Sequence, residues 1–166
     1  MRVKLIPATP EDAESIAALR NAVSDDLTFR HGPGPWTAHC TTAAVLFSLR
    51  HALLHVVLHR GEAIATLVLA TKKPWAIDRK YFSRVKRPLY LTSMAVAPER
   101  QGQGIGRACL ADAVKIARRA KADAIFLDAF DHPGAGAGPF YAKCGYRETG
   151  RVTYRGAPLV YFELLL

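Results

Sequence analysis

The sequence has little that would place it in a membrane or in an oxidising compartment. No uncharged apolar run approaches the roughly 20 residues that a membrane-spanning helix needs, and the N-terminal stretch MRVKLIPATPEDAE lacks the apolar core of a signal peptide. The three cysteines, Cys40, Cys109 and Cys144, are widely spaced and odd in number, which argues against a disulfide framework and against a CxxC metal site. We expect a cytoplasmic protein in which all three cysteines are buried thiols.

Internal repeats and low-complexity segments are also absent, so a single compact domain is expected. The chain has 166 residues, half of them apolar, which suits one domain spanning residues 1–166. Its 23 Lys and Arg exceed its 14 Asp and Glu and give a formal net charge of +9. Such a charge attracts phosphate-bearing ligands, nucleic acid or acidic membrane surfaces, and composition alone does not choose among them. Some of the cations, such as Arg118, Arg119 and Lys121, also suit the end of a helix.

Helix and strand patterns alternate in the first half of the chain. We predict a short strand over residues 3–6, then a helix that begins after the capping residue Thr9 and runs into the twenties. The segment HGPGPW, residues 31–36, cannot continue this helix, and a second helix is predicted over about 37–50. Two β-branched runs then flank Gly61, which predicts a hairpin, and a long basic loop follows over residues 71–88.

The second half of the chain predicts a βαβ unit followed by a short helix and two strands. A strand over residues 89–98 precedes the glycine-rich stretch, which opens a helix with an apolar face formed by Leu110, Ala113, Val114 and Ala117. A buried strand over 124–130 completes the unit, with a right-handed crossover. A helix around PFYAKC ends at Gly145, and strands near 146–154 and 158–165 meet at a turn at residues 155 and 156.

The stretch ERQGQGIGRACL, residues 99–110, contains three alternate glycines beside two arginines. Its spacing excludes the GxGxxG dinucleotide motif, and Ala108 after Arg107 excludes a P-loop. Backbone amides at a helix N-terminus, flanked by Arg100 and Arg107, would suit a pyrophosphate. A tight turn that only leads into a packed helix is the alternative.

Three motifs in order resemble those of the GNAT superfamily, the acyl-CoA-dependent N-acyltransferases. The segment QGQGIG, residues 101–106, matches the family's Q/R-x-x-G-x-G/A loop, and the preceding MAVAPE resembles its LAV-x-P-E strand ending. Further along, PFYAKCGY, residues 139–146, is similar to the FY-x-K-x-GF segment. The resemblance covers the order of elements along the whole chain, although residues 1–88 match in pattern only.

The resemblance implies an α/β (α+β) fold: a mixed, mostly antiparallel sheet of six to seven strands, flanked by about four helices, with a splayed parallel strand pair at the cofactor. It also implies acetyl transfer from acetyl-CoA to a primary amine of a small molecule, a peptide, or a protein N-terminus or Lys. The residues that it implies for cofactor binding are Met94, Ala95, Val96, Arg100, Gln101, Gly102, Gln103, Gly104, Ile105, Gly106, Arg107 and Lys143. Backbone groups of Met94 and Val96 would bond the pantetheine arm, and the amides of residues 101–107 would hold the pyrophosphate.

Direct attack by the amine on a thioester needs no enzyme nucleophile, because positioning supplies much of the acceleration. By resemblance, the Met94 amide would meet the oxyanion and Tyr141 would be the general acid that protonates the departing thiolate. Tyr141 could instead be a packing residue at a helix start. A role for Cys109 or Cys144 as a nucleophile ranks below buried packing.

A general base is harder to assign from the sequence. The strand in which many relatives carry a glutamate reads Tyr-Leu-Thr-Ser here, over residues 90–93, and offers no carboxylate. The remaining candidates are a water held by Ser93 and Thr92, or one of the side chains of Asp78, Asp128, Asp131 and His132.

Two further patterns need an interpretation. His51, His55 and His59 recur every four residues, but this stretch is predicted to be a strand, so we expect no metal site. The segment KKPWAIDRKYFSRVKR, residues 72–87, holds seven basic residues, one acid and three interleaved aromatic residues. In the GNAT fold this loop lies beside the acceptor site. It could select an acidic substrate, cover the cleft or be a solvated loop, and we rank direct nucleic-acid binding below the last two.

A binding module is the competing class of function. Such a protein would keep coenzyme A as a structural or regulatory ligand, or would use the basic 72–87 loop to hold nucleic acid or an acidic partner. The missing strand carboxylate keeps this alternative open, and the sequence also leaves a homodimer open.

Overall fold

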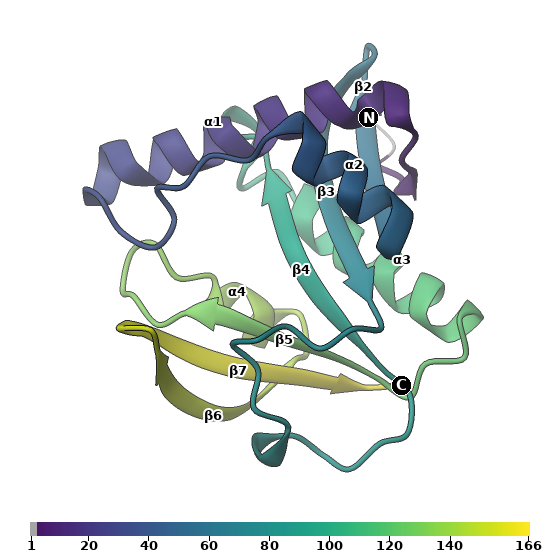
Figure 1. Ribbon diagram of the computed structural model, residues 1–166, viewed down its shortest axis with the longest axis vertical. Coiled ribbons are helices and arrows are strands. Elements are labelled where there is room, and N and C mark those ends of the chain that lie inside the picture. The colour runs from purple at the N-terminus through teal and green to yellow at the C-terminus, as the bar shows by residue number, and fades with distance from the viewer. Residues whose placement is uncertain (1–2) are drawn as a thin grey trace. The chain divides into compact units, whose positions relative to one another are not determined.

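A computed structural model describes residues 3–166 (Figure 1). Within these residues the four α-helices are α1 (Ala13–His31), α2 (Thr42–His51), α3 (Ile105–Arg119) and α4 (Gly138–Lys143). The strands are β1 (Ile6–Pro7), β2 (Leu53–His59), β3 (Glu62–Ala70), β4 (Pro88–Val96), β5 (Ala124–Phe130), β6 (Arg147–Tyr154) and β7 (Ala157–Leu165). They form a seven-stranded sheet in the order β1-β2-β3-β4-β5-β7-β6. The β4–β5 pair is parallel and the β1–β2, β2–β3, β5–β7 and β6–β7 pairs are antiparallel, which confirms the predicted fold class.

Most predicted elements are present, with two corrections. The strand expected over 3–6 is wrong in extent, because only Ile6 and Pro7 pair with β2. The helix expected from residue 37 begins at Thr42, where the Thr41 side chain accepts a hydrogen bond from the Ala44 amide at 3.1 Å. A hydroxyl that caps free amides fixes the first turn at that position. The prediction missed Thr41 as the cap.

The chain divides into two compact units. Unit 1 comprises Met1–Leu69 and Ser93–Ala113, and unit 2 comprises Ala70–Thr92 and Val114–Leu166. Both β4 and α3 therefore contribute to each unit.

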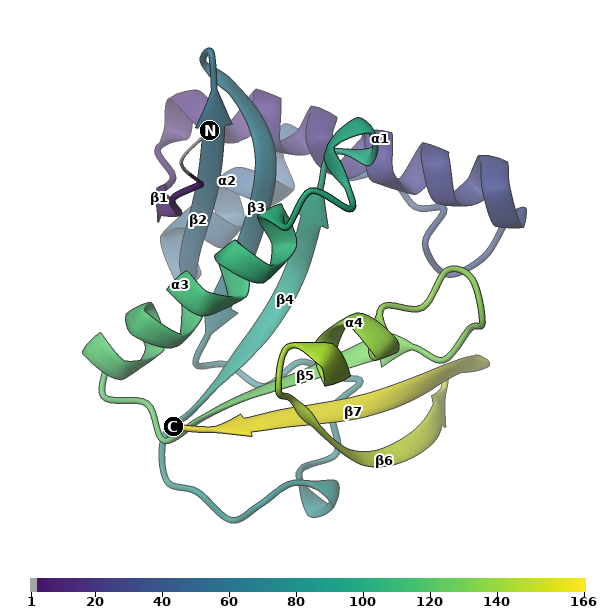
Figure 2. The ribbon, with the colours of Figure 1, turned by 180° about the vertical axis from the view of Figure 1, so that it is seen from behind.

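In unit 1, helices cover both faces of the β2–β3 hairpin. Figures 1 and 2 show α1 and α2 on one face and the first turns of α3 on the other. The core contains Ile16 of α1, Val45 of α2 and Leu67 of β3, all fully buried. The Asp112 carboxylate of α3 accepts a hydrogen bond from the Leu5 amide at 3.2 Å and so ties the N-terminal segment to this helix.

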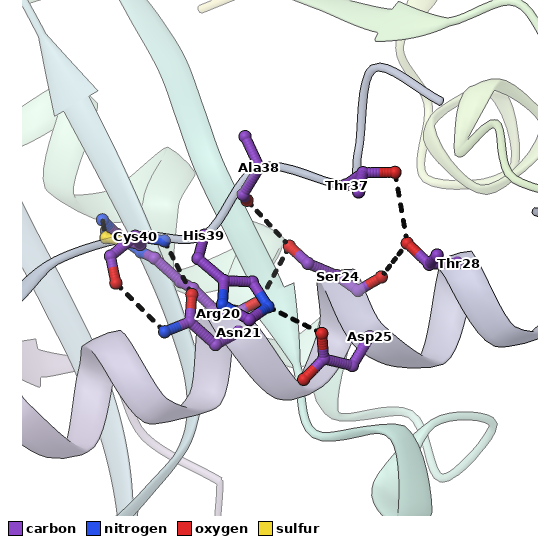
Figure 3. A network of polar contacts seen from close by, with 9 residues as sticks. All are labelled: Arg20, Asn21, Ser24, Asp25, Thr28, Thr37, Ala38, His39 and Cys40. Atoms are coloured by element: carbon purple, nitrogen blue, oxygen red, sulfur yellow. Dashed lines mark hydrogen bonds and ion pairs between the residues drawn. The ribbon is translucent and has the colours of Figure 1, made fainter. Parts of the chain in front are cut away.

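Residues 37–40, after α1, are held against that helix by a network of polar contacts (Figure 3). Asn21 and the Cys40 backbone bond each other twice, since the Asn21 amide donates to the Cys40 carbonyl at 3.0 Å and its oxygen accepts from the Cys40 N–H at 2.6 Å. His39 and Asp25 pair at 2.6 Å. The residues that follow the glycines and prolines, 37–40, are therefore held by side chains of α1.

In unit 2, a layer of aromatic side chains separates the sheet from the long loop that precedes β4. Ile77 and Phe82 of that loop are buried against Tyr90 of β4, Phe126 of β5 and Tyr161 of β7. The opposite face of this part of the sheet carries α4, as Figure 2 shows. Phe162 of β7 lies in contact range of Gly138 in α4, because neighbouring residues of a strand point to opposite faces.

The parallel ladder between β4 and β5 joins Pro88–Tyr90 to Ala124–Phe126. Further along β4, Ser93 has a φ of +51°, an unusual value for a residue other than glycine and one that interrupts the regular pleat. The division of β4 between the two units falls at this residue. Directly after β4, within unit 1, the Ala97 amide donates a hydrogen bond to the Ile64 carbonyl of β3 at 2.9 Å.

Candidate active site

The glycine loop, residues 101–106, connects the end of β4 to the start of α3 within unit 1. Gly102 and Gly104 adopt φ values of +76° and +81°, which glycine reaches at no steric cost. A Cβ built on either one would have no heavy atom within 4 Å, so these glycines are required by the backbone conformation and the space beside them is open. The predicted close approach of a ligand to this backbone fits that observation.

The first turn of α3 offers backbone donors that the helix itself does not use. The first intrahelical bond runs from the Ala108 amide to the Gly104 carbonyl at 3.0 Å. The amides of Ile105, Gly106 and Arg107 come before that bond and have no intrahelical acceptor. Together with the positive end of the helix dipole they make a suitable seat for an anion.

Two glutamines hold the glycine loop in its conformation. The Gln101 side-chain amide donates to the Val96 carbonyl at 3.1 Å, and the Gln103 side-chain amide donates to the Glu99 carbonyl at 3.2 Å. Both residues were predicted as direct cofactor contacts. In this structure their side chains bond backbone carbonyls of the segment before the loop.

The other predicted cofactor residues of unit 1 differ in exposure. Arg107 is exposed and Arg100 is half-buried. The side chains of Ala95 and Ile105 are buried, which restricts any role in binding to their backbone. Met94 and Val96 are half-buried on β4.

Tyr141 and Lys143 lie on α4 in unit 2. Lys143 is exposed, whereas Tyr141 is only 8% exposed and packs its ring against Tyr146 and Phe162, with ring centroids 5.8 and 6.1 Å away. Burial, with a smaller contribution from the Asp128 charge, raises the pKa of Tyr141 above its usual range. The phenol therefore keeps its proton at neutral pH.

The four side chains considered as a general base are now distinguishable. Asp78 is exposed and paired with Lys80 at 3.1 Å, and Asp131 is paired with Arg151 at 3.2 Å. The His132 Nδ1 atom accepts the amides of residues 134 and 135 at 3.1 and 2.9 Å. Asp128, on β5, differs from the other three, because burial raises the pKa of its carboxyl group.

The cysteines correct one expectation. Cys109 is buried, and burial, followed by the nearby Asp112 charge, raises the pKa of its thiol to about 12. A thiol that holds its proton so strongly is a poor nucleophile. Cys40 and Cys144 are half-buried, so the prediction of three buried thiols is wrong for these two.

The histidines do not gather into a metal centre. His51 ends α2 and His55 and His59 belong to β2, as the strand prediction required. Over residues 3–166 no group of three or more His, Cys, Asp or Glu side chains is arranged to hold a metal ion.

Sequence reasoning missed two features near the site residues. One is the left-handed backbone of Ser93, for which the sequence gives no signal, because serine has no preference for that conformation. The other is the Tyr146 hydroxyl, which is buried without a hydrogen-bond partner among the described residues. A tyrosine where the family's motif has phenylalanine was the available signal.

Residues 16–146 match the sequence profile of the Acetyltransferase (GNAT) family. The chain belongs to this family. The match spans the glycine loop, all of α3 and the α4 segment. No curated protein sequence matches the chain.

Several solved GNAT structures share the fold at low sequence identity. A ribosomal-protein-alanine N-acetyltransferase from Brucella melitensis has a TM-score of 0.74 at 18% identity, covering 98% of this chain and 99% of that one. YncA from Salmonella typhimurium, solved with acetyl-CoA, has a TM-score of 0.72 at 18% identity, covering 100% and 95%. The PaiA N-acetyltransferase from Thermoplasma acidophilum, in complex with coenzyme A, has a TM-score of 0.73 at 15% identity and covers both chains fully.

No helix of the described residues is long and apolar enough to cross a membrane.

Proposed function

We propose that this GNAT protein transfers the acetyl group of acetyl-CoA directly to a primary amine. The observation that carries the proposal is the anion seat at the start of α3, where amides without intrahelical acceptors follow two left-handed glycines with open space beside them. Family membership supports acetyl transfer as the reaction. The acceptor is an amine of a small molecule, a peptide, or a protein N-terminus or Lys.

The cofactor is held mainly by backbone in this proposal. The amides of residues 101–107 bind the pyrophosphate, and backbone groups of Met94 and Val96 bind the pantetheine arm. Arg100, Arg107 and Lys143 supply positive charge for the phosphates. Bound acetyl-CoA supplies an activated thioester, which a positioned amine attacks without an acyl-enzyme.

Tyr141 is the proposed general acid. Its phenol is protonated at neutral pH because burial raises its pKa, so the Oη atom carries the proton that the departing thiol requires. Its ring is fixed by Tyr146 and Phe162, which restricts the directions in which that proton can be donated.

Asp128 is the proposed general base. An alkylamine with a pKa near 10.4 is mostly protonated at neutral pH and must lose a proton before it attacks. Burial raises the pKa of the Asp128 carboxyl group, and its charge acts on Tyr141. The remaining three make ion pairs or accept backbone amides instead.

The test is a steady-state assay of coenzyme A release with a panel of primary amines. Tyr141→Phe should lower kcat by about a hundredfold or more and leave the KM for acetyl-CoA unchanged, because general acid catalysis typically contributes a factor of 10² to 10⁴. Asp128→Asn should remove the acidic limb of the pH–rate profile, since activity then no longer rises as the carboxyl group ionises.

Equal losses in kcat and in cofactor affinity for Tyr141→Phe would show that its hydroxyl is structural. If acetyl-CoA binds and no amine in the panel is acetylated, the protein is a coenzyme A-binding module.

We further propose that residues 1–166 act as one acetyltransferase domain, because the family match includes parts of both units. A cytoplasmic location and a homodimer stay predictions.

A further inference from the structure

The excess positive charge belongs entirely to unit 2. Unit 1, which contains the glycine loop, has eight Lys and Arg and eight Asp and Glu. Unit 2 has 15 Lys and Arg and six Asp and Glu. The unit that contains the proposed pyrophosphate site is therefore neutral overall, and the net charge of +9 needs a different explanation.

Much of this charge lies on the basic loop, residues 72–87, and the structure fixes that loop in place. Two of its own residues, Ile77 and Phe82, are buried against the sheet. The buried Glu163 carboxylate accepts hydrogen bonds from the Ser83 amide at 2.9 Å and from the Ser83 hydroxyl at 2.7 Å. The interpretation as a merely solvated loop does not account for these contacts, since a solvated loop needs no buried anchors.

The basic loop and β6 line a cleft of about 770 Å³ in unit 2. Lys73, Trp75, Lys80 and Tyr81 line it from the loop, and Arg151 and Tyr154 line it from β6. Tyr81 lies over Gly150 of β6, where a Cβ would come within 2.4 Å of the ring. A glycine in the strand thus allows this aromatic wall to form.

The cleft lies on the face of the sheet opposite Tyr141. Tyr161 of β7 lines the cleft, donates a hydrogen bond to the Ala76 carbonyl and accepts one from the Asp78 amide. The next residue, Phe162, packs against Tyr141. Neighbouring residues of a strand point to opposite faces, so the cleft is separate from the proposed catalytic tyrosine.

The lining combines cations with exposed aromatic rings. Trp75 is 83% exposed, which no packing requirement explains. The Lys73 ammonium donates to two neutral carbonyl oxygens, of Pro74 at 3.1 Å and Ile77 at 2.7 Å, and its charge also acts on Asp78. Asp78 is the sole acidic side chain among the described residues that line the cleft, and its exposed pair with Lys80 is weak.

We propose that this cleft binds a nucleotide, with a base stacked on Trp75 and a phosphate held by Lys73 and Lys80. Aromatic platforms beside a basic groove are the arrangement that binds bases and phosphates of single strands. A carboxylate-rich peptide would use the cations and would leave the exposed ring without a function. The nucleotide is either free or part of a single strand, and the test distinguishes the two.

The test uses the full chain without added coenzyme A, because coenzyme A carries a nucleotide of its own that would compete for the cleft. The probes are uridine monophosphate and a fluorescein-labelled decauridylate, titrated at about 50 mM salt, where phosphate contacts are strong. Trp75→Ala should weaken binding about tenfold. The double variant Lys73→Gln/Lys80→Gln should flatten the salt dependence by roughly 1.4 in log–log slope.

The matched control is Lys121→Gln, an exposed cation of unit 2 outside the cleft, which should change affinity little. Equal affinity for both probes identifies a free nucleotide, and preference for the decauridylate identifies a single strand. Absence of binding by both probes overturns the proposal. So does a Trp75→Ala variant that binds as the wild type does, or a glutamate decapeptide that competes equally well. Acetyl-CoA affinity, titrated separately on each variant, tests the proposed function independently.

Discussion

Replacing Glu163 by glutamine should destabilise the protein through the loss of one buried charge. Glu163 is 1% exposed and accepts three hydrogen bonds, two from Ser83 and one from the Arg147 guanidinium. Glutamine keeps the shape of the side chain, but its NH₂ group must face a donor that the carboxylate oxygen accepted. The Ser83 hydroxyl can turn to accept from that NH₂ group, but both hydrogen bonds with Ser83 then lose the charge of the carboxylate.

The expected cost is about 3 kcal/mol, because a hydrogen bond to a charged group contributes about 1.5–3 kcal/mol and two such bonds from Ser83 lose the charge of their acceptor. The Arg147 ion pair adds little, since that side chain is 67% exposed and solvent screens it. For a chain of this length each kcal/mol lowers Tm by about 2–4 °C, so Tm should fall by about 6–12 °C.

The effect should depend on pH. Burial raises the pKa of Glu163, but the Ser83 amide, the Ser83 hydroxyl and Arg147 outweigh it, so the folded-state pKa lies below the usual value near 4.3. A lowered carboxyl pKa stabilises the fold above the unfolded-state pKa, and this contribution is lost as the pH falls through the folded-state pKa. The difference in stability between wild type and Glu163→Gln should therefore shrink as the pH falls below the unfolded-state pKa.

Urea unfolding followed by circular dichroism at pH 7 and pH 3 measures both effects. The matched control is Glu148→Gln on β6, an exposed carboxylate paired with Arg151 at 2.6 Å, which should cost under about 1 kcal/mol. A Glu163→Gln variant as stable as the wild type at pH 7 would refute the reasoning, as would a difference of the same size at both pH values.

Two other predictions follow from local packing and burial. Gly150→Ala places a Cβ 2.4 Å from Tyr81 Cδ1 and should cost about 1–3 kcal/mol in urea unfolding, and the added substitution Tyr81→Ala should recover part of that loss. If Gly150→Ala alone leaves the stability unchanged, the predicted clash with Tyr81 does not occur. Iodoacetamide at about pH 8 should label Cys40 and Cys144 and spare Cys109, whose buried thiol has a pKa raised to about 12. Mass spectrometry counts the labels, and rapid labelling of Cys109 would contradict its burial.

The elements that were predicted correctly are those with strong local signals. The β2–β3 hairpin follows from two β-branched runs around Gly61, and β5 follows from an apolar run with the same limits as predicted. The start of α3 is marked by glycines, and its buried Leu110, Ala113 and Ala117 confirm the predicted apolar face. Each of these signals lies within a few residues of the element that it predicts.

The features that sequence reasoning missed depend on contacts between distant segments. Burial of Phe82 depends on Phe126 and Tyr161, far along the chain, and so no pattern within the basic loop reveals that it is anchored. The raised pKa of the Asp128 carboxyl group likewise comes from its burial in the folded sheet. The glycine loop was predictable because its motif lies in one continuous segment, whereas the separation of Asp128 from the other candidate bases required the structure.

The most direct test of the account is a calorimetric titration of acetyl-CoA into the wild type, Gly104→Val and Gly61→Val. Gly104 and Gly61 have similar φ values, +81° and +85°, with no heavy atom within 4 Å of a built Cβ, so valine strains both backbones alike. We predict micromolar or tighter binding by the wild type and by Gly61→Val, and at least a roughly tenfold loss for Gly104→Val, because strain there displaces the amides ahead of α3. Absence of heat with the wild type, or equal affinity of the two variants, would contradict the assignment of the glycine loop as the cofactor seat.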